Sequence, residues 1–407
     1  MSQWLEVKLG DYVNLLTGFP FKSKNYSDFE EDIKLLRSDN IAQGYLRWEN
    51  VKRWKLTDDP RESNYFLKTN DVILAMDRPW IEAGLKYSII SNKDLPCLLV
   101  QRVACLRAKE ILNQQFLRYV IGSKSFTEYV CSIETGTAVP HISGQQIKDY
   151  EFLLPPLPEQ KAIASVLSSL DDKIDLLHRQ NKTLEAMAQT LFRQWFIEEA
   201  KEDWSEFHIR DLEIYIADYV ANGSFASLKE NVTLITEKSD YALFIRNTDL
   251  KSNFANKVYV DEHSYNFLAK TKLYGGEVII SNVADVGSVH LCPRFNVPMT
   301  LGNNIIMLRS KFNYFLYLYF TSSIGQDALY AITSGSAQQK FNKTDFRALK
   351  ISLPNLAILD EFNELVSSYF IKKQYNLNQI QTLENLRDTL LPKLMSGEVR
   401  VQYQTVA

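Results

Sequence analysis

The chain has 407 residues, of which 45% are hydrophobic and 23% charged, a composition typical of a globular protein with two or three domains. Its longest apolar runs, Asn304–Leu308 and Phe315–Phe320, are too short to cross a membrane, and its first residues do not form a secretory signal. We therefore expect a cytoplasmic protein. The net charge of −3 argues against a chain that holds nucleic acid without a partner, because phosphate contacts require a basic face.

The first part of the chain predicts a mixed α/β domain. Asp71–Ala75 and Leu98–Leu106 are short aliphatic runs that follow turn residues, which predicts buried strands. Gln114–Val130 is longer and rich in aromatic residues, and predicts a helix. Lys148–Leu154 predicts a final strand that stops at Pro155, because proline has no N–H to donate to a sheet.

A long helix of the coiled-coil type is predicted next. Apolar residues return at alternating steps of three and four, which places them on one seam of the helix. A single polar residue, Asn181, interrupts this seam. Its apolar members are Ile163, Leu167, Leu170, Ile174, Leu177, Leu184, Ala188, Leu191 and Trp195.

The same order of elements returns in the second half of the chain. Glu277–Ser281 and Ile305–Arg309 predict buried strands, and Lys311–Tyr330 predicts a helix. Arg347–Leu353 predicts a strand that ends at Pro354, and a second long helix with a less regular seam follows. The second half therefore repeats the plan of the first.

The sequence is an internal duplication of one domain followed by one helix. Matching segments occur in the same order, such as Asn70–Ala75 with Gly276–Ser281 and Thr135–Ala138 with Ser334–Ala337. The spacing between copies drifts within the domains, where surface loops tolerate insertions, and is constant along the helices. The predicted bounds are 1–157 and 201–356 for the domains, 158–200 and 357–397 for the helices, and 398–407 for a tail.

Two seams of equal length in one chain predict an antiparallel coiled coil between the two helices. If they pair about their centres, Asn181 faces Asn376 and Ala188 faces Tyr369. Two buried amides that bond to each other would fix the register of the pair. The alternative is that each helix packs only on its own domain.

The familiar catalytic motifs do not occur in this sequence. There is no phosphate-binding GxxxxGK[ST] loop, no GxGxxG, no GxSxG and no metal-ligand cluster. Gly122–Ser125 resembles a phosphate loop but lacks its first glycine and its Gly-Lys pair. We therefore predict no catalytic residue, no metal and no cofactor in this chain.

Several segments resemble the DNA-specificity subunit of Type I restriction–modification systems. They are Gly10–Tyr12, Asn70–Ala75, Thr135–Ser143 and, most specifically, Leu153–Gln160 with the sequence Leu-Leu-Pro-Pro-Leu-Pro-Glu-Gln. The resemblance covers essentially the whole chain. The second joint departs from it, because Asn355–Leu359 replaces the Pro-Leu-Pro-Glu-Gln stretch.

The resemblance implies two target-recognition domains, mixed α/β and related by a pseudo-twofold, with the helices between them. Each domain would read one half of a split, asymmetric sequence in double-stranded DNA. The helices would dock two modification subunits that bind S-adenosylmethionine, and motor–nuclease subunits that use ATP and Mg²⁺ would join for restriction. Such partners would also supply positive charge that this chain lacks.

Candidate DNA contacts come mainly from the polar loop that follows the aromatic-rich helix in each copy. Amide side chains can bond to adenine, and lysine can reach guanine or phosphate. Residues at strand ends and two early lysines are further candidates. The predicted contacts are Lys22, Lys24, Arg78, Thr135, Thr137, His141 and Ser143 in the first copy, and Asn282, Ser336, Gln338, Gln339, Lys340 and Asn342 in the second.

Two other classes of function remain open from the sequence. Besides a DNA-specificity subunit, the chain could be a coiled-coil scaffold with two protein-binding domains, or an enzyme with an unrecognised site. Binding of duplex DNA with and without a modification subunit distinguishes these classes. The copies differ in most loops, so the two halves of a DNA target are expected to differ.

Overall fold

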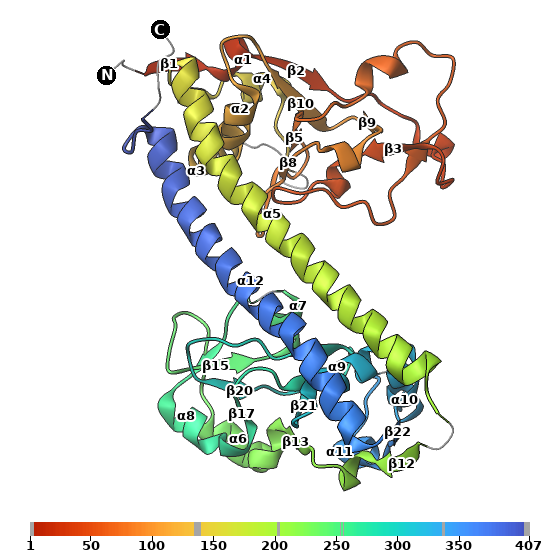
Figure 1. Ribbon diagram of the computed structural model, residues 1–407. Coiled ribbons are helices and arrows are strands. Elements are labelled where there is room, and N and C mark those ends of the chain that lie inside the picture. The colour runs from red at the N-terminus through yellow and green to blue at the C-terminus, as the bar shows by residue number, and fades with distance from the viewer. Residues whose placement is uncertain are drawn as a thin grey trace. The chain divides into compact units, whose positions relative to one another are not determined.

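The computed structural model describes residues 4–133, 140–201, 204–252, 254, 256–335 and 338–402. The chain divides into two compact units, which we describe separately. The first unit holds residues 1–175 and 381–407, and the second holds residues 176–380. Each unit thus contains one α/β domain together with a part of each long helix (Figure 1).

In the first unit, a four-stranded antiparallel sheet has its two faces in different cores. Val72 and Leu74 point to a core shared with the helices, whereas Ile73 and Ala75 point to a second core shared with a neighbouring sheet. Burial on both faces explains why this strand is apolar throughout. The sheet order is β2 (Val13–Thr17), β10 (Val103–Ala108), β5 (Val72–Ala75) and β8 (Tyr87–Ile89).

Shorter elements complete the first domain. The neighbouring sheet contains β4 (Arg53–Trp54), β3 (Ile33–Leu36) and β9 (Cys97–Leu99), and β3 and β9 run parallel. The paired strands β1 (Leu5–Lys8) and β11 (Glu151–Leu154) join the start and the end of the domain. The remaining elements are β6 (Trp80–Ile81), β7 (Gly84–Leu85), α1 (Leu9–Tyr12), α2 (Gln114–Ile121), α3 (Lys124–Ile133) and α4 (Gly144–Lys148).

The second unit repeats the four-stranded sheet and the terminal strand pair of the first, whereas its neighbouring sheet has five strands in place of three. The sheet β13 (Tyr215–Asp218), β21 (Ile305–Arg309), β18 (Val278–Ser281), β19 (Val289–Leu291) matches the four-stranded sheet of the first unit, and β12 (Ser205–His208) pairs with β22 (Lys350–Leu353). The neighbouring sheet has the order β14 (Leu234–Ile235), β16 (Tyr259–Val260), β15 (Ala242–Ile245), β20 (Met299–Leu301), β17 (Lys272–Leu273). The short helices are α6 (Phe225–Asn231), α7 (Asn247–Lys251), α8 (Glu262–Phe267), α9 (Asn313–Thr321), α10 (Ser323–Ala331) and α11 (Lys343–Ala348).

The aromatic-rich helix predicted in each copy is two helices. In the first unit the break is at Ser123, whose Oγ accepts a hydrogen bond from the Phe126 N–H at 3.1 Å and so begins a new helix. In the second unit Ser322 has extended backbone angles and accepts from the Gly325 N–H at 3.3 Å. A serine that caps the next helix ends the previous one, which periodicity alone does not reveal.

Three predicted strands were also too long. Leu98–Leu106 is divided between β9 and β10, because Arg102 has a left-handed backbone with φ 67° and turns the chain into a different sheet. Lys148 belongs to α4 and Arg347 to α11, so β11 and β22 begin later than predicted. Their predicted ends at Pro155 and Pro354 are confirmed.

The predicted seam between the long helices is confirmed within each unit. The helices are α5 (Leu157–Arg193) and α12 (Leu356–Ser396). In the second unit, the buried amides of Asn181 and Asn376 meet, and the Asn376 Nδ2 donates to the Asn181 Oδ1 at 2.9 Å. The Asn181 Nδ2 and the Asn376 Oδ1 have no partner among the described residues. The two amides therefore share one hydrogen bond and do not fully satisfy each other in the way that the sequence predicts.

Ion pairs flank the seam. In the second unit Lys373 Nζ lies 2.6 Å from the carboxylate of Glu185, which also accepts from the Tyr317 hydroxyl. In the first unit Asp171 pairs with Arg387 at 3.2 Å and with Arg118 at 2.9 Å. Both carboxylates therefore join a helix of the seam to the α/β domain of the same unit.

The joint between the first domain and α5 is held by two buried polar side chains. Gln160 accepts from the Asn113 N–H and donates to the carbonyls of Ile111 and Pro155. Glu159 accepts from the Trp4 indole at 3.1 Å and from Arg400 at 2.8 Å. The Glu-Gln pair of the Leu153–Gln160 motif therefore fixes how the helix leaves the domain.

Candidate nucleic-acid interface

In the first unit, the end of β5 and the segment directly before α4, which begins in the described part of the chain at Pro140, form one polar edge. The Met76 N–H donates to the Arg102 carbonyl at 2.9 Å, and the Arg78 N–H donates to the Pro140 carbonyl at 2.7 Å. Asp77 pairs with His141 as an isolated β-bridge. Two turns that are distant in the sequence are thus fixed side by side by their backbones.

Basic side chains gather at this edge. Arg102 lies 3.3 Å from Asp77 and keeps 60% of its side chain exposed, and Arg78 is exposed as well. Lys86 donates to the Ser38 hydroxyl at 2.9 Å, and Ser38 donates to the Asp77 carbonyl. Burial lowers the pKa of Lys86; Asp39 and Asp77 oppose this shift, whereas the nearby Arg78 and Arg47 add to it. We call Arg78, Lys86, Arg102 and His141 the first edge.

The second unit builds the same backbone frame. The Asn282 N–H donates to the Asn304 carbonyl at 3.1 Å, and the Ala284 N–H donates to the Gln339 carbonyl at 3.0 Å. Val283 and Lys340 form the equivalent isolated β-bridge. Left-handed backbones also recur, with φ of 67° at Ala284 and 62° at Asn304 where the first unit has 45° at Arg78 and 67° at Arg102.

The side chains on this second frame are mostly amides and hydroxyls. We call Asn282, Ser288, Asn304, Gln339 and Lys340 the second edge. Beside it, Lys251 lies 2.5 Å from Asp285, and Asn247 donates to the same carboxylate at 2.9 Å. The hydrogen bond from Lys251 lowers the pKa of Asp285 most, and the hydrogen bond from Asn247 lowers it further.

Four buried amide oxygens of the second unit have no hydrogen-bond partner within the described ranges, and two of them lie at or beside the second edge. These two are the Oδ1 atoms of Asn247 and Asn282. The Asn282 Nδ2 is in use, since it donates to the Phe341 carbonyl at 3.3 Å. Asn282 thus ties β18 to the loop after α10.

The structure brings some predicted contacts together and separates others. Arg78 lies with His141, and Asn282 lies with Gln339 and Lys340, as the frames require. Lys22 and Lys24 are exposed near the short 3₁₀ turn Ser23–Asn25, and no described hydrogen bond or ion pair joins them to the first edge. Gln338 is exposed in the loop of the second unit, whereas Thr135, Thr137 and Ser336 lie outside the described residues.

Two predicted contacts are engaged as helix caps. The Ser143 Oγ accepts from the Gln146 N–H at 3.1 Å and begins α4. The Asn342 Oδ1 accepts from the Asp345 N–H at 2.8 Å and begins α11. Their side chains therefore hold the loop ends in place.

Sequence reasoning missed Lys86, Arg102 and Asn304. Each stands at the turn beyond a strand, so neither hydrophobic periodicity nor a motif marks it. The duplication carried the only signal, since Arg102 and Asn304 occupy equivalent places before β10 and β21. The number of residues between matching positions of the two copies varies within the domains, so this equivalence is visible only in the backbone structure.

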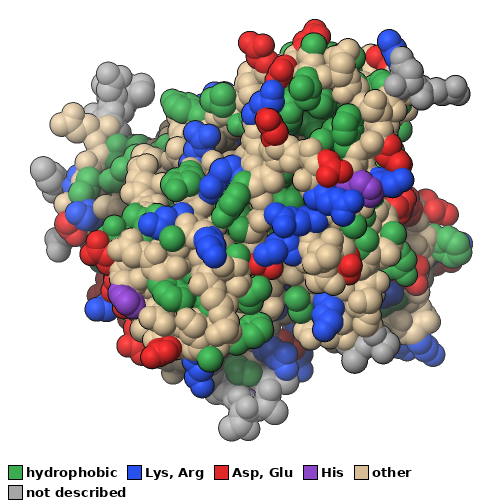
Figure 2. Space-filling view, turned by 90° about the horizontal axis from the view of Figure 1, so that it is seen from below, with side chains coloured by type: hydrophobic (Ala, Val, Ile, Leu, Met, Phe, Trp, Pro, Cys, Tyr) green, Lys and Arg blue, Asp and Glu red, His purple; other side chains and the backbone are tan. Residues whose placement is uncertain are grey.

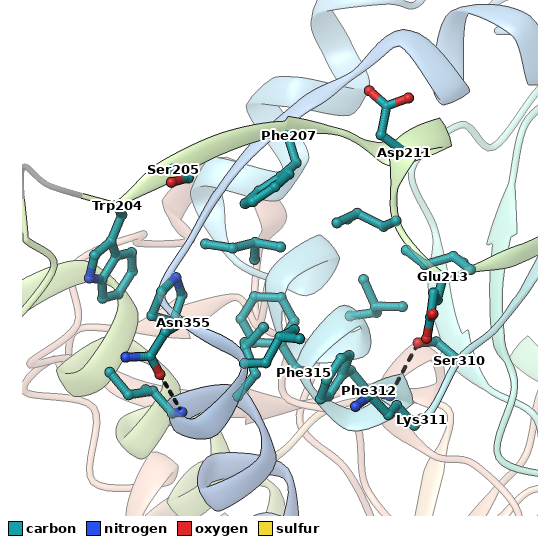
Figure 3. Close-up of a pocket in the computed structure, with 18 of the residues that line it drawn as sticks. Trp204, Ser205, Phe207, Asp211, Glu213, Ser310, Lys311, Phe312, Phe315 and Asn355 are labelled. Carbon is teal, nitrogen blue, oxygen red and sulfur yellow. Dashed lines mark hydrogen bonds between the residues drawn. The ribbon is translucent and has the colours of Figure 1, made fainter.

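A separate cavity of about 540 Å³ lies in the second unit at the joint with α12 (Figure 3). Trp204 and Phe207 reach it from the segment around β12, and Phe315 reaches it from α9. The Asn355 Oδ1 on its border accepts from the Ile358 N–H at 3.1 Å and caps α12. Ile358 and Leu359 stand where the first joint has Glu159 and Gln160, so the second joint lacks that polar lock.

Across the described ranges, no group of three His, Cys, Asp or Glu side chains is placed to hold a metal ion. A search of the helices within those ranges also finds none that is long and apolar enough to cross a membrane. Cys97, Cys105 and Cys292 are buried, and Cys131 is exposed.

Two segments of the chain, residues 1–186 and 201–385, match the family model of the Type I restriction modification DNA specificity domain. The chain belongs to this family. Over 190 residues the chain is 36% identical to the EcoAI specificity subunit of Escherichia coli, a match that covers 46% of this chain and 31% of that relative. The chain thus spans about a third of the length of this relative.

Other relatives match over nearly their full length. The EcoBI specificity subunit of Escherichia coli is 22% identical over 440 residues, which covers 99% of this chain and 88% of the relative. The crystal structure of a Type I S subunit from M. genitalium aligns with a TM-score of 0.59 at 14% identity, covering 96% of both chains. This likeness supports the fold of a specificity subunit with two tandem α/β domains.

Proposed function

We propose that this specificity subunit recognises a split, asymmetric sequence in double-stranded DNA, with one half read by each unit. The observation that carries the proposal is the repeated frame of the two edges. The same backbone hydrogen bonds and bridges recur in both units, while the exposed side chains differ at nearly every position. Two domains that bind different DNA sequences in the same orientation require a common backbone frame that carries different polar side chains.

Local concentrations of positive charge support DNA binding despite the net charge of −3. Figure 2 shows several Lys and Arg side chains beside one another on one face. At the first edge, Arg78, Lys86 and Arg102 similarly gather around Asp77. Phosphate contacts depend on such local groups rather than on the total charge.

The proposal also assigns the long helices to docking of two modification subunits. Large apolar side chains remain exposed on these helices within the second unit: Leu176, Met187, Leu365, Ile371 and Tyr375. Exposed apolar side chains of this kind suit contacts with a partner chain. S-adenosylmethionine, and ATP with Mg²⁺ for restriction, would bind to the partner subunits, and this chain would perform no chemistry itself.

Mapping of methylated bases tests the proposed function. The full chain is co-expressed with its modification subunits in a host whose DNA carries no other methylation, and the methylated motif is determined. We expect one motif with two different halves and an unspecified spacer. A palindromic motif, or methylation that does not depend on this chain, would overturn the proposal, and a complex indifferent to DNA would instead favour a protein-binding scaffold.

A further inference from the structure

The two edges offer different chemistry at equivalent backbone positions. The backbone carbonyls of Arg102 and Asn304 accept hydrogen bonds from equivalent N–H groups, and both residues have a left-handed backbone. Lys86 and Ser288 are equivalent as well, because their carbonyls accept from the last N–H groups of β5 and β18, at 3.0 and 2.9 Å. Differences between these side chains are therefore differences in what the same place on each unit can bind.

The first edge presents two guanidinium groups, and most of their N–H donors have no partner among the described residues. Asp77 orients Arg102 through one contact at 3.3 Å, which leaves most of the five N–H donors of that group available. The exposed side chain of Arg78 makes no hydrogen bond or ion pair to any described residue. Guanine presents two acceptors, N7 and O6, at a spacing that a guanidinium fork matches.

The second edge has neutral residues in place of Arg78, Lys86 and Arg102, and it carries one cation, Lys340, at the bridge position of His141. Ala284 stands for Arg78, Ser288 for Lys86, and Asn304 for Arg102. Asn304 and Gln339 are exposed, and the Gln339 carbonyl lies on the frame itself. The nearby Lys251 is already paired with Asp285 at 2.5 Å. An amide side chain offers an NH2 donor group beside a carbonyl acceptor, and the two match N7 and the N6 amino group of adenine.

We propose that the first unit selects guanine through Arg78 and Arg102, and that the second unit selects adenine through Asn304 and Gln339. This inference rests on the proposed function, since it names the bases that the two halves of the target contain. It assigns the difference between the halves to a few side chains on one shared frame. Asp77 is a positioning residue in this scheme, because it acts by orienting Arg102.

The test compares methylated motifs of complexes that carry single substitutions. Arg102→Asn gives the first unit the residue of the second, and asparagine tolerates the left-handed backbone at this position. Arg102→Lys keeps the charge and removes the fork. We expect both substitutions to relax discrimination at one guanine by about tenfold or more, since a bidentate pair supplies that much selectivity. The half of the motif that changes is the half read by the first unit.

The second unit is tested by Asn304→Gly, which permits the same backbone angle and removes the amide. We expect discrimination to fall at one adenine in the other half of the motif. The matched controls are Asn303→Ala, at the exposed neighbour, and Arg61→Ala, which removes a guanidinium from the first unit away from its edge. Both controls should leave the motif unchanged, and thermal melting of each complex shows whether a variant has folded.

The outcomes separate this inference from the function on which it rests. A wild-type complex without a sequence-specific motif overturns both. A split motif whose first half contains no guanine overturns the inference alone. So does a uniform loss of methylation in Arg102→Asn that Arg102→Lys restores, because this pattern identifies a phosphate contact.

Discussion

At the scale of single residues, the structure separates side chains that build the edges from those that can face a ligand. Ser143 and Asn342 were predicted as contacts because they are polar and lie in equivalent loops. In the structure each accepts a hydrogen bond from an N–H three residues ahead. Polar character and position in a loop do not distinguish a cap from a contact, because both require the same side-chain oxygen.

This assignment predicts that Ser143→Ala and Asn342→Ala lower stability without changing sequence preference. Loss of a cap costs about 1 kcal/mol, because the first N–H groups of the helix lose their acceptor. Urea unfolding of the full chain measures the change in free energy, and the methylated motif measures preference. The control is Gln338→Ala, at an exposed loop residue, which should change stability by less than about 0.5 kcal/mol. A motif altered by Ser143→Ala would show that this hydroxyl contacts DNA.

Glu185 supplies a pH-dependent contribution to stability. Burial raises the pKa of this carboxyl, but hydrogen bonds from Lys373 and Tyr317 outweigh burial and hold the pKa below its usual 4.5. The carboxylate therefore stabilises the folded state above pH 4.5, and this contribution is lost as the pH falls through the lowered pKa. We expect the stability gap between wild type and Glu185→Gln to be largest near neutral pH and to close in acid.

Thermal melting between pH 7 and about pH 3 measures this gap. Glu364→Gln, at an exposed position on α12, is the matched surface control. A gap for Glu185→Gln that stays constant over this range would mean that the negative charge of Glu185 does not contribute.

At the scale of elements, hydrophobic pattern predicted most of the long elements and misplaced several boundaries. The heptad seams, β5, β18 and the ends at Pro155 and Pro354 follow from periodicity and from the missing N–H of proline. The boundaries that were wrong depend on local conformation. Ser123 and Ser322 begin new helices, and the left-handed Arg102 moves the chain between sheets, which an apolar pattern does not encode.

The Asn181–Asn376 pair illustrates what the seam pattern does predict. A polar residue at equivalent places of two seams indicated their register, and the amides meet at 2.9 Å. Asn181→Leu or Asn376→Leu alone leaves one buried amide without its partner, at a cost of about 1–3 kcal/mol in unfolding free energy. The double leucine variant removes both amides, so we expect it to recover stability relative to either single variant.

Urea unfolding of the full chain compares the four proteins of this double-mutant cycle. Leu177→Ala, which removes apolar volume from the same seam, should cost about 2 kcal/mol or more and shows the size of a simple packing loss. If the double leucine variant loses the sum of the two single losses, the amides do not act as a pair.

At the scale of the whole molecule, the duplication supplies both the fold and the difference in function. Equivalent strands, breaks and left-handed turns recur in both units, so the backbone frame is common to them. The first joint is locked by Glu159 and Gln160, whereas the second has Ile358 and Leu359 beside a cavity. The sequence showed that the joints differ, but only the hydrogen bonds of the first joint show what the Glu-Gln pair contributes.

The net charge of the chain bears on how tightly it binds DNA. A chain with net charge −3 should hold DNA weakly by itself at physiological salt, and more tightly in a complex whose partners neutralise further phosphates. Within that complex, Lys22 and Lys24 are predicted phosphate contacts outside the first edge. Replacing both with alanine should reduce the slope of log affinity against log salt by about 2, because each phosphate contact contributes about 0.9. Titrations of duplex DNA at several salt concentrations measure this slope, and an unchanged slope would exclude both lysines as phosphate contacts.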